Sequence, residues 1–382
     1  MLAYFDHNAT TPVDSRVFAA MTPWFGEHHG NPSSAHGYGR AARAAIETAR
    51  GQVAEMLGAR ANEVIFTSSG SEANNAVLYA VGEHCDFAGH LVLATFEHPS
   101  IQASAGRLVA RGMTITHVAP GADGLIAASA VEDALRDDTR LVCLMLANNE
   151  LGTVQPVAEV TRLCRERGIP VLCDAVQAVG KIAVDVGALG VEYLTLGGHK
   201  FHGPPGVAAL WVGEDAIYRP LLVGGAQERG RRASTENVPA IVGLGAACAL
   251  ASQELEVRQQ HLRQLRDTFE AGLSAIPDVR VHCQDAPRLP HTSNIAFLGL
   301  RGYDIMQRLD ERGYAISTGA ACHSGEPQPS STVLALGYSP SEAIGALRIS
   351  FGMPNTLEEV AALLSVLESE VAALRRSQGV TA

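Results

Sequence analysis

A Ser- and Gly-rich stretch near residue 70 has the composition of an anion-binding loop. Residues 66–75 read Phe-Thr-Ser-Ser-Gly-Ser-Glu-Ala-Asn-Asn, follow an apolar run and open a helical pattern. Backbone N–H groups and the positive end of a helix dipole attract anions, so a phosphate group would fit this position. An ordinary Ser-capped helix start accounts for the same residues. The stretch is not a Walker loop, because no Gly-Lys-Ser/Thr follows it.

Asp174 and Lys200 each come directly after an apolar run or close to its end. A buried carboxylate needs a cationic or hydrogen-bonded partner, and the protonated pyridine nitrogen of an electron-sink cofactor would be such a partner. Burial lowers the pKa of a lysine and suits its amine for a Schiff base. A helix cap for Asp174 and an exposed loop position for Lys200 are the ordinary alternatives. The three segments carry more weight together, because they fall on strand ends in one chain order.

The elements that must position these residues alternate between short apolar runs and helical patterns from about residue 60 to 212. This alternation is typical of an α/β fold with a mostly parallel, seven-stranded sheet covered by helices on both faces. Ligands of such sheets bind where the strands end. The expected strands are 64–67, 91–94, 114–118, 141–146, 170–173, 193–196 and 207–212, and the expected helices are 71–82, 99–111, 129–136 and 157–167.

A connecting helix or helix pair over 238–273 and shorter patterns beyond it predict a smaller α+β domain. We expect the large, cofactor-binding domain to span residues 14–257, and the small domain to combine residues 1–13 with 258–382. Strand or helix patterns of the small domain lie at 279–282, 293–298, 303–312, 314–317, 346–351 and 357–374.

Composition narrows the class of protein. The 382 residues carry a formal net charge of −11 without a long basic run, which argues against direct binding of nucleic acid. No apolar stretch approaches the roughly 20 residues that cross a bilayer, and no secretory signal is visible at Met1, so we expect no membrane partner and a cytoplasmic location. The seven cysteines lack a C-x-x-C pair and indicate neither a disulfide framework nor a metal site.

Several motifs, distributed almost from end to end, resemble those of the cysteine desulfurases. These are fold-type I, class V aminotransferase-like enzymes that use pyridoxal 5'-phosphate (PLP). The resemblance implies an enzyme with L-cysteine as its substrate and with a sulfur-acceptor protein as its partner. The motifs are Asp6–Pro12, Gly30–Ser34, Thr95–His98, Ala147–Gly152, Asp174–Gln177, Gly198–Lys200, Gln227–Gly230 and Ser234–Asn237.

The resemblance assigns roles residue by residue. Lys200 would hold the cofactor in a Schiff base, Asp174 would pair with the pyridine nitrogen, and His98 would stack on the ring. Gln177 would bond the phenolic oxygen, and Asn149 would lie near ring and substrate. The planar fork of Arg348 suits the substrate carboxylate. The phosphate would be held by Gly70, Ser71 and His199, with Thr235 reaching in from the second subunit of a homodimer.

Cys322 lies in a Gly- and Pro-rich segment that predicts a loop. The cofactor weakens the bond from Cβ to sulfur, and the protein must supply a nucleophile, so we expect Cys322 to take the sulfur as a persulfide while the rest of the substrate leaves as alanine. A thiolate is the attacking species, and His323 is near enough in sequence to influence it. An inert loop thiol is the ordinary alternative.

Some features depart from the common family pattern. Gly197 stands where a phosphate-binding Ser or Thr is usual, Met353 stands where an Arg is common, and the longer C-terminal tail of housekeeping members is missing. Residues 319–324 are more similar to the selenocysteine lyases, so that activity is the closest alternative.

Two other functions, a non-catalytic protein and an aminotransferase, explain fewer of these residues. A non-catalytic persulfide carrier or assembly scaffold would be expected to lose Lys200 or Asp174, which are both present. An aminotransferase is compatible with the fold, because fold does not fix function, but it has no need of a cysteine loop.

Overall fold

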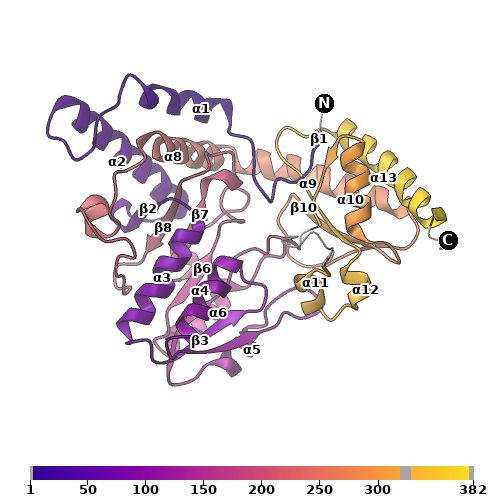
Figure 1. Cartoon of the computed structure of the whole chain (residues 1–382), viewed down its shortest axis with the longest axis horizontal. Coiled ribbons are helices and arrows are strands. Elements are labelled where there is room, and N and C mark those ends of the chain that lie inside the picture. The colour runs from indigo at the N-terminus through magenta and orange to yellow at the C-terminus, as the bar shows by residue number, and fades with distance from the viewer. Residues whose placement is uncertain (1–2, 319–327, 378–382) are drawn as a thin grey trace.

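A seven-stranded sheet forms the centre of the larger lobe of the computed structural model, which describes residues 3–318 and 328–377 (Figure 1). β8 runs antiparallel between β2 and β7, and the strands from β7 to β4 are mutually parallel. The expected mostly parallel sheet is thereby confirmed. The strand order is β2 (Val64–Thr67), β8 (Ala208–Val212), β7 (Tyr193–Gly197), β6 (Val171–Asp174), β5 (Thr139–Cys143), β3 (His90–Ala94) and β4 (Thr114–Val118).

Helices cover both faces of this sheet because its strands are apolar on both sides. Along β3, Leu91 and Leu93 pack into one core and Val92 and Ala94 into the other, as the two-residue period of a strand requires. The first core includes residues of α3 (Gly70–His84) and α4 (Pro99–Val109). The second includes residues of α1 (Ser15–Met21), α2 (Gly37–Leu57), α5 (Ala128–Ala134), α6 (Val157–Glu166), α7 (Val186–Leu189) and α8 (Val238–Gln253).

The sequence expectations had no counterpart for α2, a helix of 21 residues that packs along α8. Its buried residues include Ala42, Ile46, Ala49, Val53 and Leu57. These positions recur every three or four residues, which is the stripe of an amphipathic helix. The pattern was therefore present in the sequence, although exposed polar residues such as Arg40, Thr48 and Glu55 lower the mean hydropathy of the segment.

The smaller lobe is an α+β unit, as expected. Its antiparallel sheet has the order β12 (Ala346–Ser350), β10 (Thr292–Phe297) and β9 (Val279–Val281), and β1 (Ala3–Tyr4) pairs in parallel with β11 (Tyr314–Ala315). A separate core gathers Phe5, Phe269, Phe297 and Phe351. The domain boundaries at 13/14 and 257/258 stay predictions. The helices are α9 (Leu255–Gly272), α10 (Gly302–Glu311), α11 (Ser331–Ala335), α12 (Pro340–Ala343) and α13 (Leu357–Ser377).

Five single 3-10 turns complete the described elements. They are Thr22–Phe25, Ala61–Glu63, Gly198–Lys200, Gln227–Gly230 and Leu273–Ala275. The turn Gly198–Lys200 follows β7 directly and therefore carries the predicted cofactor lysine to the edge of the sheet.

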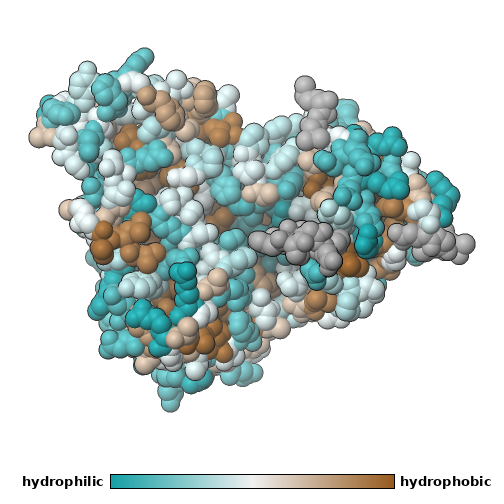
Figure 2. Space-filling view, viewed as in Figure 1, coloured by the Kyte–Doolittle hydropathy of each residue, from teal (hydrophilic) through white to brown (hydrophobic). Residues whose placement is uncertain are grey.

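The surface in Figure 2 is mostly hydrophilic, with small separate apolar patches on both lobes. No single helix among the described residues is long and apolar enough to span a membrane. The helices α8 and α9, extended to Ala275, pass that test of length and composition only as a pair, across a bend of 77°.

Candidate active site

A cavity of about 260 Å³ lies where the parallel strands end, bordered by the N-terminal segment and by β12 of the smaller lobe. Of the eleven site residues expected from the sequence, nine line it. Thr235 does not line it, and Cys322 lies outside the described residues. The nine are Gly70, Ser71, His98, Asn149, Asp174, Gln177, His199, Lys200 and Arg348.

The Ser- and Gly-rich stretch forms the turn between β2 and α3, as expected. The Ser69 side chain caps the helix by accepting a hydrogen bond from the Glu72 N–H. A Cβ on Gly70 would lie 2.9 Å from Val176 Cγ2, so only glycine fits this turn without a shift. The first turn of a 15-residue helix therefore faces the cavity with its positive dipole end, where a phosphate would be stabilised.

Asp174 ends β6 and is buried, with 6% of its surface exposed. Its Oδ2 accepts a hydrogen bond of 2.8 Å from the Asn74 side chain, and its Oδ1 accepts one of 3.0 Å from the Val176 N–H. The carboxylate is thus held in place by neutral donors. No cation pairs with Asp174 among the described residues, so its charge remains available to a cationic ligand group in the cavity.

Lys200 reaches back from the sheet to the N-terminal segment. Its amine donates hydrogen bonds to the carbonyl oxygens of Asn8, at 2.7 Å, and Ala9, at 2.8 Å. Burial, and then the positive charge of Arg348, lower the pKa of Lys200 to about 8. A sizeable fraction of the amine is therefore neutral near neutral pH, as a Schiff-base lysine requires.

The two histidines of the cavity are held as neutral rings. His98 follows β3 and caps α4, with its Nδ1 accepting from the Ser100 N–H at 3.1 Å. Burial lowers the pKa of His98 below its usual value. The Nδ1 of His199 lies 3.1 Å from Thr10 Oγ1, and burial followed by repulsion from Lys200 lowers the pKa of His199 to about 4. A neutral imidazole can donate to a phosphate through one nitrogen or stack on an aromatic ring.

Arg348 enters the cavity from β12, and its side chain is only 6% exposed. One terminal nitrogen lies 2.6 Å from Asp6 Oδ1, and the other donates to the Asn149 carbonyl oxygen at 2.9 Å. The guanidinium is thereby fixed by residues from the N-terminal segment and from the loop after β5. Its planar fork suits it for a ligand carboxylate.

The sequence expectations missed Asn74 and Glu97. Asn74 lies one helical turn beyond Gly70, which places both on the same face of α3. Glu97 is buried, and its Oε1 accepts from the Met145 N–H at 2.6 Å. Burial, followed by the charge of Asp174, raises the pKa of Glu97 to about 8. The Glu97 carboxyl is therefore largely protonated at neutral pH.

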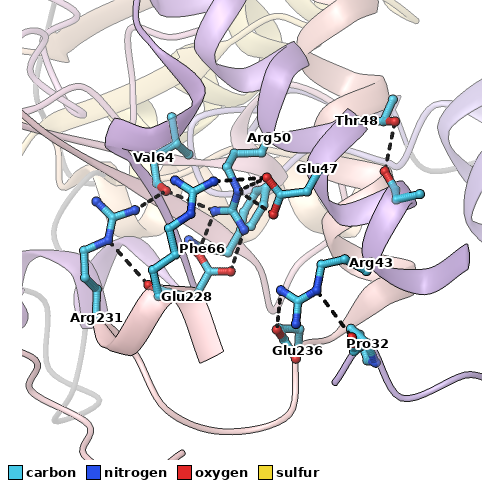
Figure 3. A network of polar contacts seen from close by, with 12 residues as sticks. Pro32, Arg43, Glu47, Thr48, Arg50, Val64, Phe66, Glu228, Arg231 and Glu236 are labelled. Carbon is cyan, nitrogen blue, oxygen red and sulfur yellow. Dashed lines mark hydrogen bonds and ion pairs between the residues drawn. The ribbon is translucent and has the colours of Figure 1, made fainter. Parts of the chain in front are cut away.

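The segment before Thr235 is clamped to the strand that leads into the anion loop (Figure 3). Arg50 and Glu228 form a buried ion pair with a shortest contact of 2.6 Å, and Glu228 Oε2 also accepts from the Phe66 N–H at 2.9 Å. Glu228 and Arg229 both have positive φ, at 48° and 60°, a conformation that costs energy for residues other than glycine. The surrounding contacts hold this turn and leave Thr235 exposed at the surface.

The donor set fits PLP. A helix N-terminus suits the phosphate, the buried Asp174 suits a protonated pyridine nitrogen, and Lys200, with its lowered pKa, suits the aldehyde carbon. These three groups belong to α3, β6 and the turn after β7, so the sheet itself sets their spacing. The volume of about 260 Å³ lies near the lower end for small-molecule sites, roughly 300 Å³.

Comparisons with known proteins agree with this chemistry. The family model described as aminotransferase class-V matches residues 3–363. The cysteine desulfurase IscS of Methanosarcina thermophila is 39% identical over 380 residues, which cover 99% of this chain and 94% of that protein. The cysteine desulfurase of Trichormus azollae is 40% identical over 97% of this chain and 93% of that protein.

Solved structures give the same result. A NifS-like protein superposes with a TM-score of 0.92 at 35% identity, over 97% of this chain and 100% of that one. SspA in complex with cysteine superposes with a TM-score of 0.81 at 35% identity, over 91% of this chain and 98% of that one. The chain therefore belongs to the class-V aminotransferase family of PLP-dependent enzymes. Within that family it is a cysteine desulfurase, which removes sulfur from L-cysteine for transfer to an acceptor.

Proposed function

We propose that the chain desulfurates L-cysteine in the cavity around Lys200 and passes the sulfur to Cys322. The observation that carries this assignment is the convergence of Lys200, Asp174 and Arg348 in one cavity. Bound PLP supplies an electron sink that acidifies the substrate Cα and weakens the bond from Cβ to sulfur. The structural neighbour SspA was solved with cysteine, which supports the same amino acid as the ligand here.

Different residues around the cavity would bind different parts of the cofactor and of the substrate. Asp174 would keep the pyridine nitrogen protonated, His98 would stack on the ring, and Gln177 would bond its phenolic oxygen. Gly70, Ser71 and His199 would hold the phosphate. Arg348 would bind the substrate carboxylate, with Asn149 beside it, and the 2.6 Å contact between Arg348 and Asp6 supports a guanidinium that is already oriented.

Lys200 would move the proton of the substrate Cα. Its amine is hydrogen-bonded to the carbonyl oxygens of Asn8 and Ala9, which hold it at the edge of the cavity. With its pKa lowered to about 8, Lys200 can accept and return a proton near neutral pH.

The sulfur-transfer step would use the thiolate of Cys322. Its sulfur attacks the substrate sulfur, a sulfur–sulfur bond forms, and the bond from Cβ to sulfur breaks. The electron pair of the broken bond stays with the carbon fragment, which takes up protons and leaves as alanine. Cys322 lies outside the described residues, so its role rests on the family resemblance.

A homodimer would complete the phosphate site. Thr235 is exposed, lies beyond the clamped turn Gln227–Gly230, and would donate its hydroxyl to the cavity of a second subunit. Large apolar side chains exposed on the larger lobe would be candidates for the interface of such a homodimer. They include Phe18, 61% exposed, Phe25, 67% exposed, and Val223, 80% exposed. The acceptor protein and the cytoplasmic location stay predictions.

The variant Cys322→Ala tests the sulfur assignment. It should keep the yellow colour of bound PLP and its response to cysteine but lose persulfide formation and most alanine release. Cys283→Ala is the matched control, because Cys283 is a buried thiol of the smaller lobe and burial raises its pKa to about 11. Alanine release at full rate from Cys322→Ala would show that the thiol is not the sulfur acceptor.

A further inference from the structure

The chain contains only two lysines among its 29 basic residues, and every other basic position is Arg. One lysine is Lys200. The other is Lys181, which is buried with 4% of its surface exposed. An exposed cation tolerates either residue, whereas an arginine cannot lose its charge in a protein. A lysine kept at a buried position in such an Arg-rich chain points to a need for an amine that can be neutral.

The backbone of Lys181 is fixed in a tight turn after β6. Its N–H donates to the Ala178 carbonyl, and its own carbonyl accepts from the Gln259 side chain at 3.0 Å. Gly180 has a φ of 78°, and a Cβ there would lie 2.6 Å from Phe201 Cβ. The turn therefore packs closely against the residue that follows Lys200.

The positive charges of Lys200 and Arg348 disfavour a further cation at Lys181. Burial lowers the pKa of Lys181 well below its usual value, and Lys200 and Arg348 lower it further. Lys181 makes no ion pair with any residue in 3–318 or 328–377. Its amine donates instead to a neutral acceptor, the Oε1 of Gln177, at 3.0 Å.

This hydrogen bond sets the orientation of the Gln177 amide. The Oε1 of Gln177 faces Lys181, and the Nε2 donates to the Asn8 carbonyl oxygen at 2.9 Å. An amide nitrogen carries two hydrogens, so one remains for the cavity that Gln177 lines. An inverted amide would place its oxygen against the Asn8 carbonyl oxygen and would lose the hydrogen bond that Lys181 donates to Oε1.

A second cavity of about 20 Å³ borders Lys181 and is lined in part by His7, His202 and His291. A histidine ring carries no negative charge, and burial lowers the pKa of each of these three, so they are neutral neighbours that give a lysine cation no counter-charge. Both ring nitrogens of His291 are buried without a hydrogen-bond partner. The volume accommodates one water molecule, which needs roughly 10–15 Å³. Such a water would accept the remaining hydrogen of the neutral Lys181 amine.

We propose that Lys181 is a positioning residue of the desulfurase, whose amine fixes the Gln177 amide so that its nitrogen faces the phenolic oxygen of the cofactor. The inference rests on the proposed contact between Gln177 and that oxygen. The hydrogen bond from Lys181 explains why Gln177 would present its amide nitrogen, a donor, to the phenolic oxygen. A donor stabilises the oxygen as an anion and so lowers the pH at which the bound cofactor loses its proton.

Titration of the visible absorbance of bound PLP against pH tests the proposal without turnover. Lys181→Met removes the donor and keeps an unbranched, apolar chain of similar length. The midpoint of the titration should rise by about one pH unit, the size expected for a lost hydrogen bond to a charged group. Gln177→Ala should raise the midpoint similarly. The double variant should match Gln177→Ala alone, because Lys181 acts only through Gln177.

The results separate the positioning role of Lys181 from the proposed contact between Gln177 and the phenolic oxygen. If Gln177→Ala raises the midpoint and Lys181→Met leaves it unchanged, or if the two shifts add, the positioning role is wrong and the Gln177 contact stands. If Gln177→Ala has no effect, the contact itself is wrong and the inference falls with it. Lys181→Leu answers the same question should Lys181→Met not fold.

A second measurement tests the need for a neutral side chain. Lys181→Arg would bury a permanent charge beside Lys200 and Arg348, so its thermal midpoint should fall well below that of Lys181→Met. An arginine variant as stable as the methionine variant would contradict this part of the proposal.

Discussion

The Asn74 side chain donates a hydrogen bond of 2.8 Å to Asp174 Oδ2 and a second, of 3.0 Å, to Ser100 Oγ. Asn74 lies on the helix whose first turn forms the anion loop, and Asp174 lies at the end of β6. The helix α3 therefore contacts both ends of the proposed cofactor site. It fixes the distance between the phosphate position and the carboxylate through one rigid element.

The first prediction concerns this contact. Asn74→Ala should weaken PLP binding about tenfold, because a hydrogen bond to a charged group contributes roughly 1.5 kcal/mol or more. Asn75→Ala is the matched control, since the Asn75 side chain donates to the backbone of its own helix and is not among the cavity residues. Equilibrium dialysis of the cofactor measures both, and equal dissociation constants for the two variants would contradict a role for Asn74.

The second prediction concerns pH. Because burial and Arg348 lower the pKa of Lys200 to about 8, the cofactor-free protein should take up PLP faster as the pH rises through 8 and then reach a plateau. Arg348→Gln removes a repelling cation, so the Lys200 pKa should rise and the midpoint should move to higher pH. Arg301→Gln, at an exposed site in the smaller lobe, should leave it unchanged. A wild-type midpoint near 10 would refute the lowered pKa.

The third prediction concerns Gly197, which stands where a Ser or Thr would supply a hydroxyl group to the phosphate. A Cβ at this position would meet no atom closer than 3.5 Å, and its φ of −135° is open to any residue. Gly197→Ser should therefore fold and should tighten cofactor binding roughly threefold to tenfold, the range for one added hydrogen bond. Gly197→Ala adds the carbon without the hydroxyl. The idea fails if the serine and alanine variants bind PLP equally well.

The fourth prediction concerns the clamp in Figure 3. Arg50 and Glu228 have side chains only 2% exposed, so Arg50→Met would leave a buried carboxylate without its cation. We expect a loss of about 3–5 kcal/mol in the free energy of unfolding. Arg162→Met removes one partner of an ion pair whose side chains are 63% and 65% exposed, and it should cost less than about 1 kcal/mol. Urea unfolding compares them, and similar losses would argue against a buried clamp.

Much of the fold could be predicted because hydrophobic periodicity is a local property. The strands 64–67 and 114–118 coincide with β2 and β4, since short apolar or alternating runs between turns leave few alternatives. The antiparallel placement of β8 between β2 and β7 could not be read in the same way. Pairing across more than 140 residues depends on the tertiary fold and leaves no local signal.

The residues that line the cavity could be predicted where they belong to a motif, and residues were missed where their place in the site depends on a neighbouring side chain. Lys200 and Asp174 lie at strand ends in recognisable sequences. Asn74 and Lys181 act through Asp174 and Gln177, so their importance appears only when the side chains lie side by side. The roles given to Thr235 and Cys322 stay predictions, because one depends on a second subunit and the other lies outside the described residues.

The N-terminal segment completes the cavity through contacts with residues that lie far away in the sequence. Asp6 bridges to Ser350 and pairs with Arg348, and the second contact joins residues that lie 342 positions apart in the sequence. β2, likewise, pairs only after β8 has been synthesised. An interrupted or truncated translation product would lack the wall of the cavity that Arg348 and Asn8 form. A chain that ends before β12 would therefore lack the guanidinium that is proposed to bind the substrate carboxylate.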